Sequence, residues 1–480
     1  MKLVARYLCL VAIVILTACA VQLPANESPT GIPSLWSTPP ISTSETRLAQ
    51  LNDWWSQFDD PLLPALIHDA QNASPQMAQA LARVAEARAL ARQAGAARAP
   101  SANGSASIER SKQTDGLKEP AFTDGQLSID ASWELDIFGG LRHAADAAAT
   151  RAQAASLQWY DARISLAAEV AQDYVNFRNC EALANVLDEE SAAQDKLAEL
   201  TQLKVKAGFE SPANGALANA AQADVNSQRI AQHAACEVAL SQLSVVSAQD
   251  VPALRPRLSS RAAQLPRPAA FQVSNVPAEV LAQRPDIAAS ERELRAAAYD
   301  VGVADADRYP QLTLNGSIGL NFVPDIHGNA TTLPFWSIGP TLTLPLFDAG
   351  RRQAALDAAR ARLAQAQATH EGRLRTAVGE VEQAIIQLNS ASQREADAAR
   401  SVAGYREFLN ATDQLWRLGG GSEIDLENAR RQFLTAQSTL LDVQREHVGA
   451  WITLYKAIGG GWSGSDKVDT ASNATIRTSK

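Results

Sequence analysis

Residues 74–100 read SPQMAQALARVAEARALARQAGAARAP, and residues 284–310 read RPDIAASERELRAAAYDVGVADADRYP. The two stretches align without a gap at an offset of 210 residues. Both have proline at their second position and Arg-x-Pro at their end. A repeat of this length within one chain is typical of an internal duplication.

Two later matches extend the duplication. Phe138–Arg142 (FGGLR) aligns with Phe347–Arg351 (FDAGR) at an offset of 209, and Ala207–Ser211 aligns with Leu418–Ser422 at an offset of 211. Because the offset drifts so little over half of the chain, we expect two copies of one structural unit, arranged around an axis. The first repeat is expected at residues 49–265 and the second at 266–460, with a tail at 461–480.

The first 18 residues have the pattern of a secretion signal. Two basic residues precede Tyr7–Leu16, an apolar stretch too short to span a bilayer as a helix. Leu16-Thr17-Ala18-Cys19 resembles the bacterial lipobox, in which the cysteine becomes the lipid-bearing first residue. We therefore expect lipidation of Cys19 and an extended tether over residues 19–48, which are rich in Pro, Ser and Thr. The alternative is an ordinary signal peptide with an incidental cysteine.

Composition argues against several classes of function. The formal net charge of −9 argues against a nucleic-acid partner. The six histidines and four cysteines show no metal-ligand spacing, and the chain has no nucleophile elbow, phosphate loop or dinucleotide fingerprint. We expect neither an enzyme nor a bound metal or cofactor.

Two long alanine-rich stretches predict long helices. Residues 142–206 contain neither proline nor glycine, and residues 351–417 contain only three glycines. At 1.5 Å per residue, each helix would be a rod of about 100 Å, a length that favours coiled-coil packing. The alternative is a generic coiled coil, which the helices alone do not exclude.

Strands precede each long helix. Apolar and polar residues alternate with a period of two in 127–137, 312–322 and 337–346, and a weaker version runs through 102–110. Each copy therefore reads helix, strand, strand, long helix. The strand regions are expected at about 101–137 and 311–347, with turns near Asp115-Gly116 and between Pro324 and Ala330.

Four such strands are too few to close a barrel. Each is long enough to cross a bilayer at a tilt, with one apolar face and one polar face. Since an open sheet edge cannot face lipid, we expect the barrel to be shared by three chains, which supply twelve strands. The alternative is a pair of soluble amphipathic hairpins.

Glycine ends both long helices. Gly208 and Gly419 are expected to provide the left-handed residue of a helix C-terminus, and Ser211 and Ser422 to cap the helices that follow. The two helical hairpins are expected at about 142–247 and 351–458. The segments before the strands, about 74–98 and 284–308, would cover the rest of each long helix.

The two remaining cysteines flank the first hairpin tip. Cys180 and Cys236 each lie 28 residues from Gly208, so they are level in an antiparallel hairpin. We predict that they are adjacent and can form a disulfide in an oxidising compartment. The alternative is that they face different sides of their helices.

Several motifs, in order along the chain, resemble those of the outer-membrane efflux protein family, which is also known as the TolC-like outer-membrane factors. Within that family, the chain is most similar to the NodT-type lipoproteins. The motifs, which span about residues 50–460, are Trp54-Trp55-Ser56-Gln57-Phe58, Trp133-Glu134-Leu135-Asp136-Ile137-Phe138-Gly139, Arg284-Pro285-Asp286-Ile287 with Glu291, and Leu344-Pro345-Leu346-Phe347-Asp348-Ala349-Gly350-Arg351.

The resemblance implies an α+β membrane protein, a homotrimer whose twelve-stranded outer-membrane β-barrel is continuous with a periplasmic α-helical coiled-coil barrel. It implies a periplasmic membrane-fusion adaptor and an inner-membrane pump as partners, with outer-membrane lipid around the barrel. It also implies an equatorial girdle from residues 49–70, 246–283 and the segment after Gly459. The chain would be a passive exit duct for which the pump supplies the energy.

The resemblance assigns two sites. The positions that meet the adaptor are the hairpin tips, at Gly208, Phe209, Ser211, Leu418, Gly419 and Ser422. Asp425 falls where the family places an acidic ring at the periplasmic entrance. The alternatives are that the tip residues only cap helices and that Asp425 is a solvated carboxylate in a first helical turn. The chain departs from the family pattern at Asn428, at Gly421 and at Asn214, the neutral counterpart of Asp425.

The favoured function is the outer-membrane channel of a tripartite, RND-type efflux system for drugs or other small molecules. One alternative is the outer-membrane duct of a type I protein-secretion system, which shares the fold. Another is a structural envelope lipoprotein with a coiled coil and no pore, which the alternating strands oppose.

Overall fold

The structure is a computed structural model that describes residues 54–112, 121–267, 284–324 and 330–462. The predicted signal, Cys19, the tether and both predicted strand turns lie outside these residues, apart from the ends of the second turn. The chain forms two compact units, and each unit combines residues from both halves of the sequence. Among the described residues, one unit contains 82–112, 121–156, 289–324 and 330–372, and the other contains 54–81, 157–267, 284–288 and 373–462.

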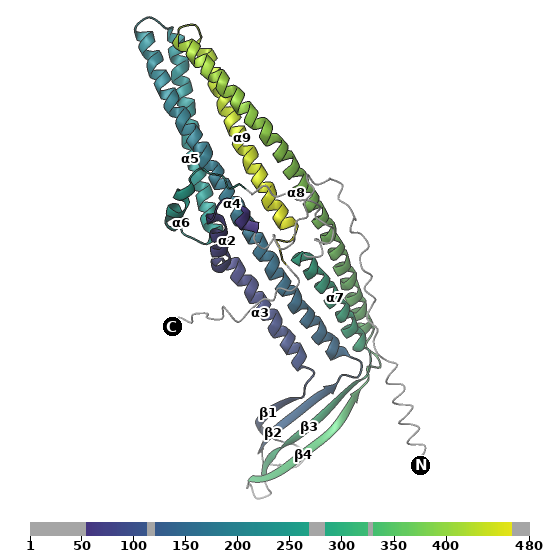
Figure 1. Cartoon of the computed structure of the whole chain (residues 1–480). Coiled ribbons are helices and arrows are strands. Elements are labelled where there is room, and N and C mark those ends of the chain that lie inside the picture. Colours follow the sequence, from purple (N-terminus) through teal and green to yellow (C-terminus); the bar gives the residue numbers. More distant parts are fainter. Residues whose placement is uncertain (1–53, 113–120, 268–283, 325–329, 463–480) are drawn as a thin grey trace. The chain divides into compact units, whose positions relative to one another are not determined.

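The first unit contains a four-stranded antiparallel sheet in the order β1-β2-β3-β4 (Figure 1). The strands are β1 (Ser101–Ser111), β2 (Phe122–Leu135), β3 (Gln311–Pro324) and β4 (Ala330–Thr343). β4 is shorter at its end than the alternation predicts, because Leu344–Leu346 lies outside the strand. Pairing of β2 with β3 joins the two halves of the sequence within one sheet.

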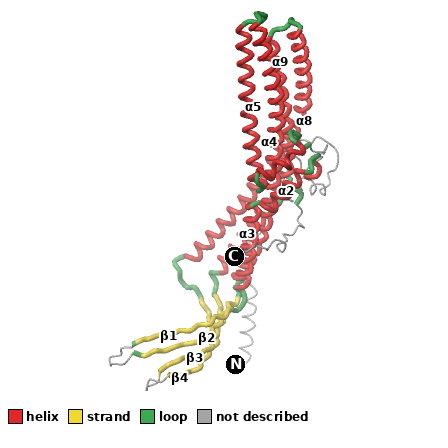
Figure 2. The backbone as a smooth tube through the Cα atoms, turned by 90° about the vertical axis from the view of Figure 1, so that its left-hand side faces the viewer, coloured by secondary structure: helices red, strands yellow, loops and turns green. Residues whose placement is uncertain are grey.

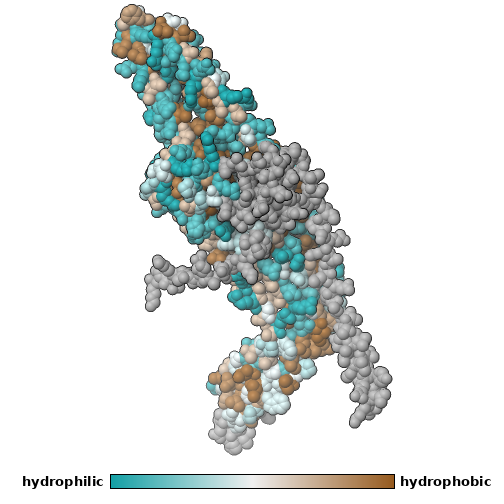
Figure 3. Space-filling model, viewed as in Figure 1, coloured by the Kyte–Doolittle hydropathy of each residue, from teal (hydrophilic) through white to brown (hydrophobic). Residues whose placement is uncertain are grey.

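The two faces of the sheet differ in polarity. On one face, large apolar side chains are exposed, and hydrophobic residues gather over the strands in Figure 3; they include Ile108, Leu127, Ile129, Ile318, Trp336, Ile338 and Leu342. On the other face, Asp130 accepts hydrogen bonds from Ser128 at 2.8 Å and Ser317 at 2.7 Å. Asn315 extends this network from Ser132 to Thr341.

Each long helix has 67 residues: α4 is Gly140–Lys206 and α8 is Arg351–Arg417. Gly139 and Gly350, with φ of 80° and 86°, directly precede them in the left-handed region that glycine tolerates best. The shorter helices α3 (Pro75–Ala96) and α7 (Pro285–Ala306) precede the strands. No described helix is both long enough and apolar enough to span a membrane.

The alignment of Phe138 with Phe347 is wrong by two residues. The left-handed glycines and the helix starts are equivalent at an offset of 211, because the turn into each helix is built around its glycine. The two phenylalanines consequently have different surroundings. Phe138 stacks on Tyr309 with ring centroids 4.8 Å apart, whereas Phe347 is 91% exposed.

In the second unit, each long helix turns back into a shorter antiparallel partner (Figure 2). These partners are α5 (Pro212–Ser247) after α4, and α9 (Glu423–Ala457) after α8. The core of this unit lies away from the tips and combines leucine and aromatic side chains from α2 (Leu62–Ala73), α4, α5, α6 (Val251–Leu258), α8 and α9. Its fully buried members include Leu63, Leu66, Tyr174, Leu240, Leu243, Leu254 and Leu454.

A buried arginine links the surrounding segments to α4. The Arg178 side chain is fully buried, and its guanidinium donates to Tyr174 at 2.9 Å, Glu181 at 2.8 Å and the carbonyl oxygen of Leu258 at 2.9 Å. Tyr174 in turn donates to Asp60 at 2.5 Å. A buried charge is stable only when it has such partners, so this network ties the segment before α2 and the last residue of α6 to the first hairpin.

Cys180 on α4 and Cys236 on α5 lie side by side in a disulfide, with Cα atoms 5.4 Å apart. Both residues are buried. The amide of Gln232, one turn before Cys236, donates to the carbonyl oxygen of Cys180 at 3.2 Å. The pair therefore links the two helices of the first hairpin, well away from its tip.

We predict that protein produced in an oxidising periplasm yields a Cys180–Cys236 linked peptide in non-reducing peptide mapping. The bond closes a loop with a sequence separation of 56 residues, so its loss should reduce the free energy of unfolding by up to about 4 kcal/mol. A Cys236→Ser variant is the control and should unfold at a lower temperature. Two free thiols in the wild-type protein would contradict the prediction.

Candidate functional site at the hairpin tips

The first tip is a glycine-ended helix followed by a capped one. Gly208 has φ of 78°, and the Phe209 N–H donates to the Lys204 carbonyl at 2.9 Å, which closes a Schellman motif. Ser211 then accepts from the Asn214 N–H at 3.2 Å as the N-cap of α5. This geometry leaves the Phe209 ring 84% exposed at the end of the hairpin.

The second tip repeats the arrangement. Gly419 also has φ of 78°, and the Gly420 N–H donates to the Leu415 carbonyl at 2.9 Å. Ser422 accepts from the Asp425 N–H at 3.1 Å as the N-cap of α9. Here the exposed apolar residue is Leu418, at 85%. Each tip therefore presents one large apolar side chain to solvent on a backbone held by glycine and serine.

Asp425 is exposed in the first turn of α9, where the Ser422 hydroxyl donates to its carboxylate at 2.6 Å. Ser422 therefore caps α9 through the Asp425 N–H, and its hydroxyl also donates to the Asp425 carboxylate. An exposed carboxylate is available to ions, so capping is compatible with a second role. Asn428 accepts from Arg431 at 2.7 Å, and a side chain at Gly421 would come within 3.2 Å of the Trp416 backbone nitrogen.

Glu423 is a tip residue that sequence reasoning missed. Its side chain is only 2% exposed, and the buried Thr201 hydroxyl lies 2.8 and 2.9 Å from its two carboxylate oxygens. The contact joins α9 of the second hairpin to α4 of the first. Burial raises the pKa of the Glu423 carboxyl above its usual value, and the Thr201 hydrogen bond offsets part of that rise.

Two partly buried carboxyl groups follow along the same pair of helices. Burial raises the pKa of Glu190 on α4 and of Glu427 on α9. The Arg430 guanidinium lies 3.9 Å from Glu190 and offsets part of the shift. The signal for this cluster was present in the sequence, because Glu423, Glu427 and Arg430 have the i, i+4, i+7 spacing of one helix face.

Leu197, Trp416 and Leu426 form a small buried apolar cluster beside Thr201. The Lys204 ammonium lies 4.0 Å from the centre of the Trp416 ring, a cation–π contact. These contacts come from α4, α8 and α9, so they pack the two hairpins against each other just behind their tips. No group of three or more His, Cys, Asp or Glu side chains in the described ranges is placed to hold a metal ion.

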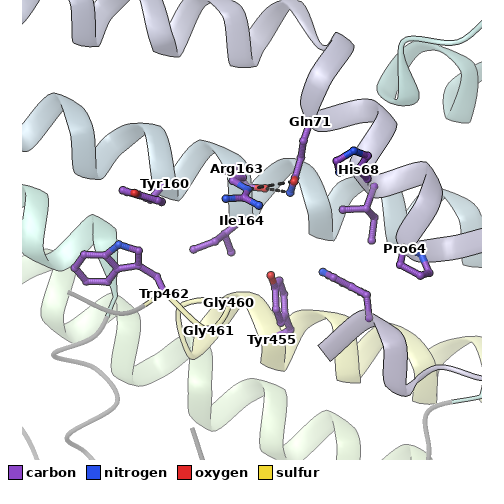
Figure 4. A pocket seen from close by; sticks show the side chains of 12 residues that line it. Pro64, His68, Gln71, Tyr160, Arg163, Ile164, Tyr455, Gly460, Gly461 and Trp462 are labelled. Carbon is purple, nitrogen blue, oxygen red and sulfur yellow. Dashed lines mark hydrogen bonds between the residues drawn. The ribbon is translucent and has the colours of Figure 1, made fainter. Parts of the chain in front are cut away.

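A cavity of about 260 Å³ lies in the second unit, near the end of α9 (Figure 4). Its walls are aromatic, formed by Trp55, Tyr160, Tyr455 and Trp462. Arg163, at its edge, donates to the Gln71 side chain at 3.1 Å.

The glycine turn beside this cavity packs closely on α4. Gly460 has φ of 61°, and a side chain there would lie 2.7 Å from Ile164. The cavity is therefore a feature of how this turn packs on α4 and α2, and we assign no ligand to it.

Comparison of Glu423→Gln with the wild type should reveal how the buried carboxyl makes the stability of the folded protein depend on pH. A carboxyl whose pKa is raised on folding leaves stability unchanged below its unfolded pKa, and stability is lost as pH rises from there through the raised pKa. Glu423→Gln keeps a hydrogen-bond acceptor for Thr201 and removes the buried charge, so it should be more stable than the wild type near pH 7.5. The difference should shrink as pH falls towards 5.

Thermal unfolding across pH 5–8 measures this difference. Glu199→Gln, which changes an exposed carboxylate on the same stretch of α4, is the matched control and should follow the wild type at every pH. A Glu423→Gln variant that is less stable than the wild type at pH 7.5 would show that the charge itself holds the hairpins together.

Comparison with known proteins identifies the family. The family model described as outer membrane efflux protein matches residues 66–255 and 276–460. Nodulation protein T of Rhizobium leguminosarum bv. viciae is 27% identical over 423 residues, covering 85% of this chain and 84% of that protein. The outer membrane protein OprJ of Pseudomonas aeruginosa is 28% identical over 465 residues, covering 93% and 94%.

Solved structures agree with this assignment. The outer-membrane channel OprN matches with a TM-score of 0.82 and 26% identity, covering 92% of this chain and 99% of that one. The MtrE outer membrane channel of Neisseria gonorrhoeae, described in its open state, has the same fold, with a TM-score of 0.78 at 24% identity over 92% and 98% of the two chains. Since the family model covers more than half of the sequence in two consecutive matches, the chain belongs to the outer membrane efflux protein family.

Proposed function

We propose that the protein is the outer-membrane channel of a tripartite, RND-type efflux system and works as a passive trimeric exit duct for small molecules. The observation that carries this proposal is the four-stranded sheet, with one exposed apolar face, one polar face and two outer strands. The family consists of outer-membrane efflux proteins and not of enzymes.

Three chains supply the twelve strands of the proposed barrel. In lipid, every backbone N–H and C=O group needs a partner, so the outer edges of β1 and β4 require neighbouring strands. The apolar face would then meet lipid. The network around Asp130 and Asn315 would line a water-filled lumen, where serine and asparagine side chains are well solvated.

The two repeats, at 49–265 and 266–460, would together give each chain two strand hairpins and two helical hairpins. Cys19 would carry the lipid, and residues 19–48 would connect that anchor to the first repeat. Ala20, rather than aspartate, follows the cysteine and favours sorting to the outer membrane.

The proposed partners are a periplasmic membrane-fusion adaptor and an inner-membrane pump. The exposed Phe209 and Leu418 at the tips are suited to bind an adaptor, because apolar side chains held on a rigid backbone lose little conformational entropy on binding. The capping role of Ser211 and Ser422 supports this proposal, since the caps fix the positions of these side chains.

A protein-secretion duct is the other transport function compatible with the fold. The relatives favour small molecules, because their names include a toluene efflux pump protein and a pyoverdine export protein, both of Pseudomonas putida. These cargoes differ widely in size and polarity, so the fold does not select one substrate. A structural lipoprotein without a pore does not fit membership in an efflux family.

Planar-bilayer conductance tests the proposed entrance site at Asp425. We predict that purified wild-type trimers conduct cations preferentially and that Asp425→Asn loses most of this preference, because three carboxylates would be removed from one narrow ring. Asparagine suits the turn, since Asn214 already occupies the equivalent position in the first copy and caps with Ser211. The readout is the reversal potential in a KCl gradient.

Asn214→Asp is the complementary variant and should raise the cation preference by adding a second ring of carboxylates. An unchanged reversal potential in Asp425→Asn would contradict the entrance role of Asp425 but would not contradict the proposed channel function. Wild-type trimers that insert into the bilayer and carry no current would count against the duct itself, provided that a substitution that removes the Thr201 hydroxyl, and with it the hydrogen bond to Glu423, also fails to open it.

A further inference from the structure

β1 and β4 are the outer strands of the sheet, and within the described part of the chain neither has a second neighbour. Each therefore presents a row of backbone hydrogen-bonding groups at its free edge. The duplication offers a way to determine what pairs with these edges, because the equivalents of β1 and β4 in the other copy, β3 and β2, pair with each other inside the sheet.

The equivalences follow from elements outside the pairing itself. β1 corresponds to β3 at an offset of 210, the offset that also relates the 22-residue helices α3 and α7. β2 corresponds to β4 at an offset of 211, which relates the two 67-residue helices. Applied to the pair Ser101–Ser132, these offsets give Gln311–Thr343, which is the pair observed between β3 and β4. The two offsets therefore reproduce the observed register of β3 and β4 without a shift.

The same offsets convert the β2–β3 pairing into a pairing of β4 with β1. Because β4 and β1 are the two outer strands of one sheet, this pairing would join two chains. We propose that β4 of one chain pairs antiparallel with β1 of the next in a single register, in which Leu342 lies opposite Ala106, Thr341 opposite Ser107 and Gly339 opposite Glu109. These pairs are the equivalents of Ala131–Gly316, Asp130–Ser317 and Ser128–Gly319. The inference rests on the proposed shared barrel and adds the register that joins its subunits.

The polarity of the two faces agrees with this register. It places Leu342 and Ile338 on the same face as Ala106 and Ile108, so the exposed apolar face continues across the subunit boundary. A slip of one residue would bring Ile108 to the polar face beside Thr341 or Gly339, because side chains alternate along a strand. Only slips by even numbers of residues preserve the faces, and the duplication selects one of them.

Side-chain contacts inside the chain support the same choice. Ser317 donates to Asp130 at 2.7 Å, and their equivalents at the boundary are Ser107 and Thr341. We therefore expect the hydroxyls of Ser107 and Thr341 from neighbouring chains to be within hydrogen-bonding distance. The polar network of the lumen would then run through the subunit boundary without interruption.

Cysteine cross-linking in assembled protein tests the register. Oxidation conditions are first set so that Asp130→Cys with Ser317→Cys forms its bond within one chain. Under these conditions, Thr341→Cys with Ser107→Cys should link neighbouring chains into dimers and trimers on non-reducing gels. The linked fraction should be at least fivefold higher than for Thr341→Cys with Ser105→Cys or Thr341→Cys with Glu109→Cys, which represent slips by two residues.

The outcomes separate the register from the proposed function. Stronger linkage of either slipped pair, or no linkage of any pair in protein that is trimeric by native mass, would overturn the register and leave the shared barrel. Protein that is monomeric before oxidation would overturn both. All variants retain Cys180 and Cys236, so any background from the native cysteines is equal among them.

Discussion

Unpaired backbone groups at the two edges of the sheet are the constraint on which the rest of the structure depends. Edge N–H and C=O groups cost several kcal/mol each when they face lipid, so a four-stranded sheet cannot remain alone in a membrane. The exposed apolar face, which carries Ile129, Ile318 and Trp336, would be equally unfavourable in water. The edges are paired when neighbouring chains complete the sheet, and the apolar face is covered when the completed sheet lies in lipid.

Duplication supplies the symmetry that such an assembly needs. Each copy contributes two strands and one helical hairpin, and in the proposed trimer the contacts between the copies within a chain would be templates for contacts between chains. The β2–β3 pairing and the Thr201–Glu423 contact are both of this kind, since each joins the first copy to the second. Three chains with two copies each would place six similar units around one axis.

Much of the fold was predictable because its signals are local. Left-handed glycines, serine caps and period-two alternation each depend on a few neighbouring residues, and the tips at Gly208 and Gly419 have the expected geometry. The level positions of Cys180 and Cys236 followed from counting along a hairpin. The offset near Phe138 was misjudged because matching phenylalanines outweighed Gly139, although the conformation of the glycine determines where the helix starts.

The burial of Glu423 behind the tips could not be predicted in the same way. Glu423 lies one residue after a cap, where acidic residues are common and normally solvated, so its burial depends on how α9 packs against α4. Only tertiary structure shows that Thr201 meets it. The role expected of the exposed Asp425, two residues later, came from the family resemblance. Glu423, which helps to hold the two hairpins together, is thus buried, whereas Asp425, the residue proposed for the entrance, is exposed only two residues away.

The most direct test of the shared barrel is the native mass of the protein extracted from outer membranes in mild detergent. The account predicts one species with the mass of three lipidated chains, which separates into monomers only when the sheet unfolds. A folded monomer that keeps its four strands, shown by circular dichroism of the same sample, would contradict it.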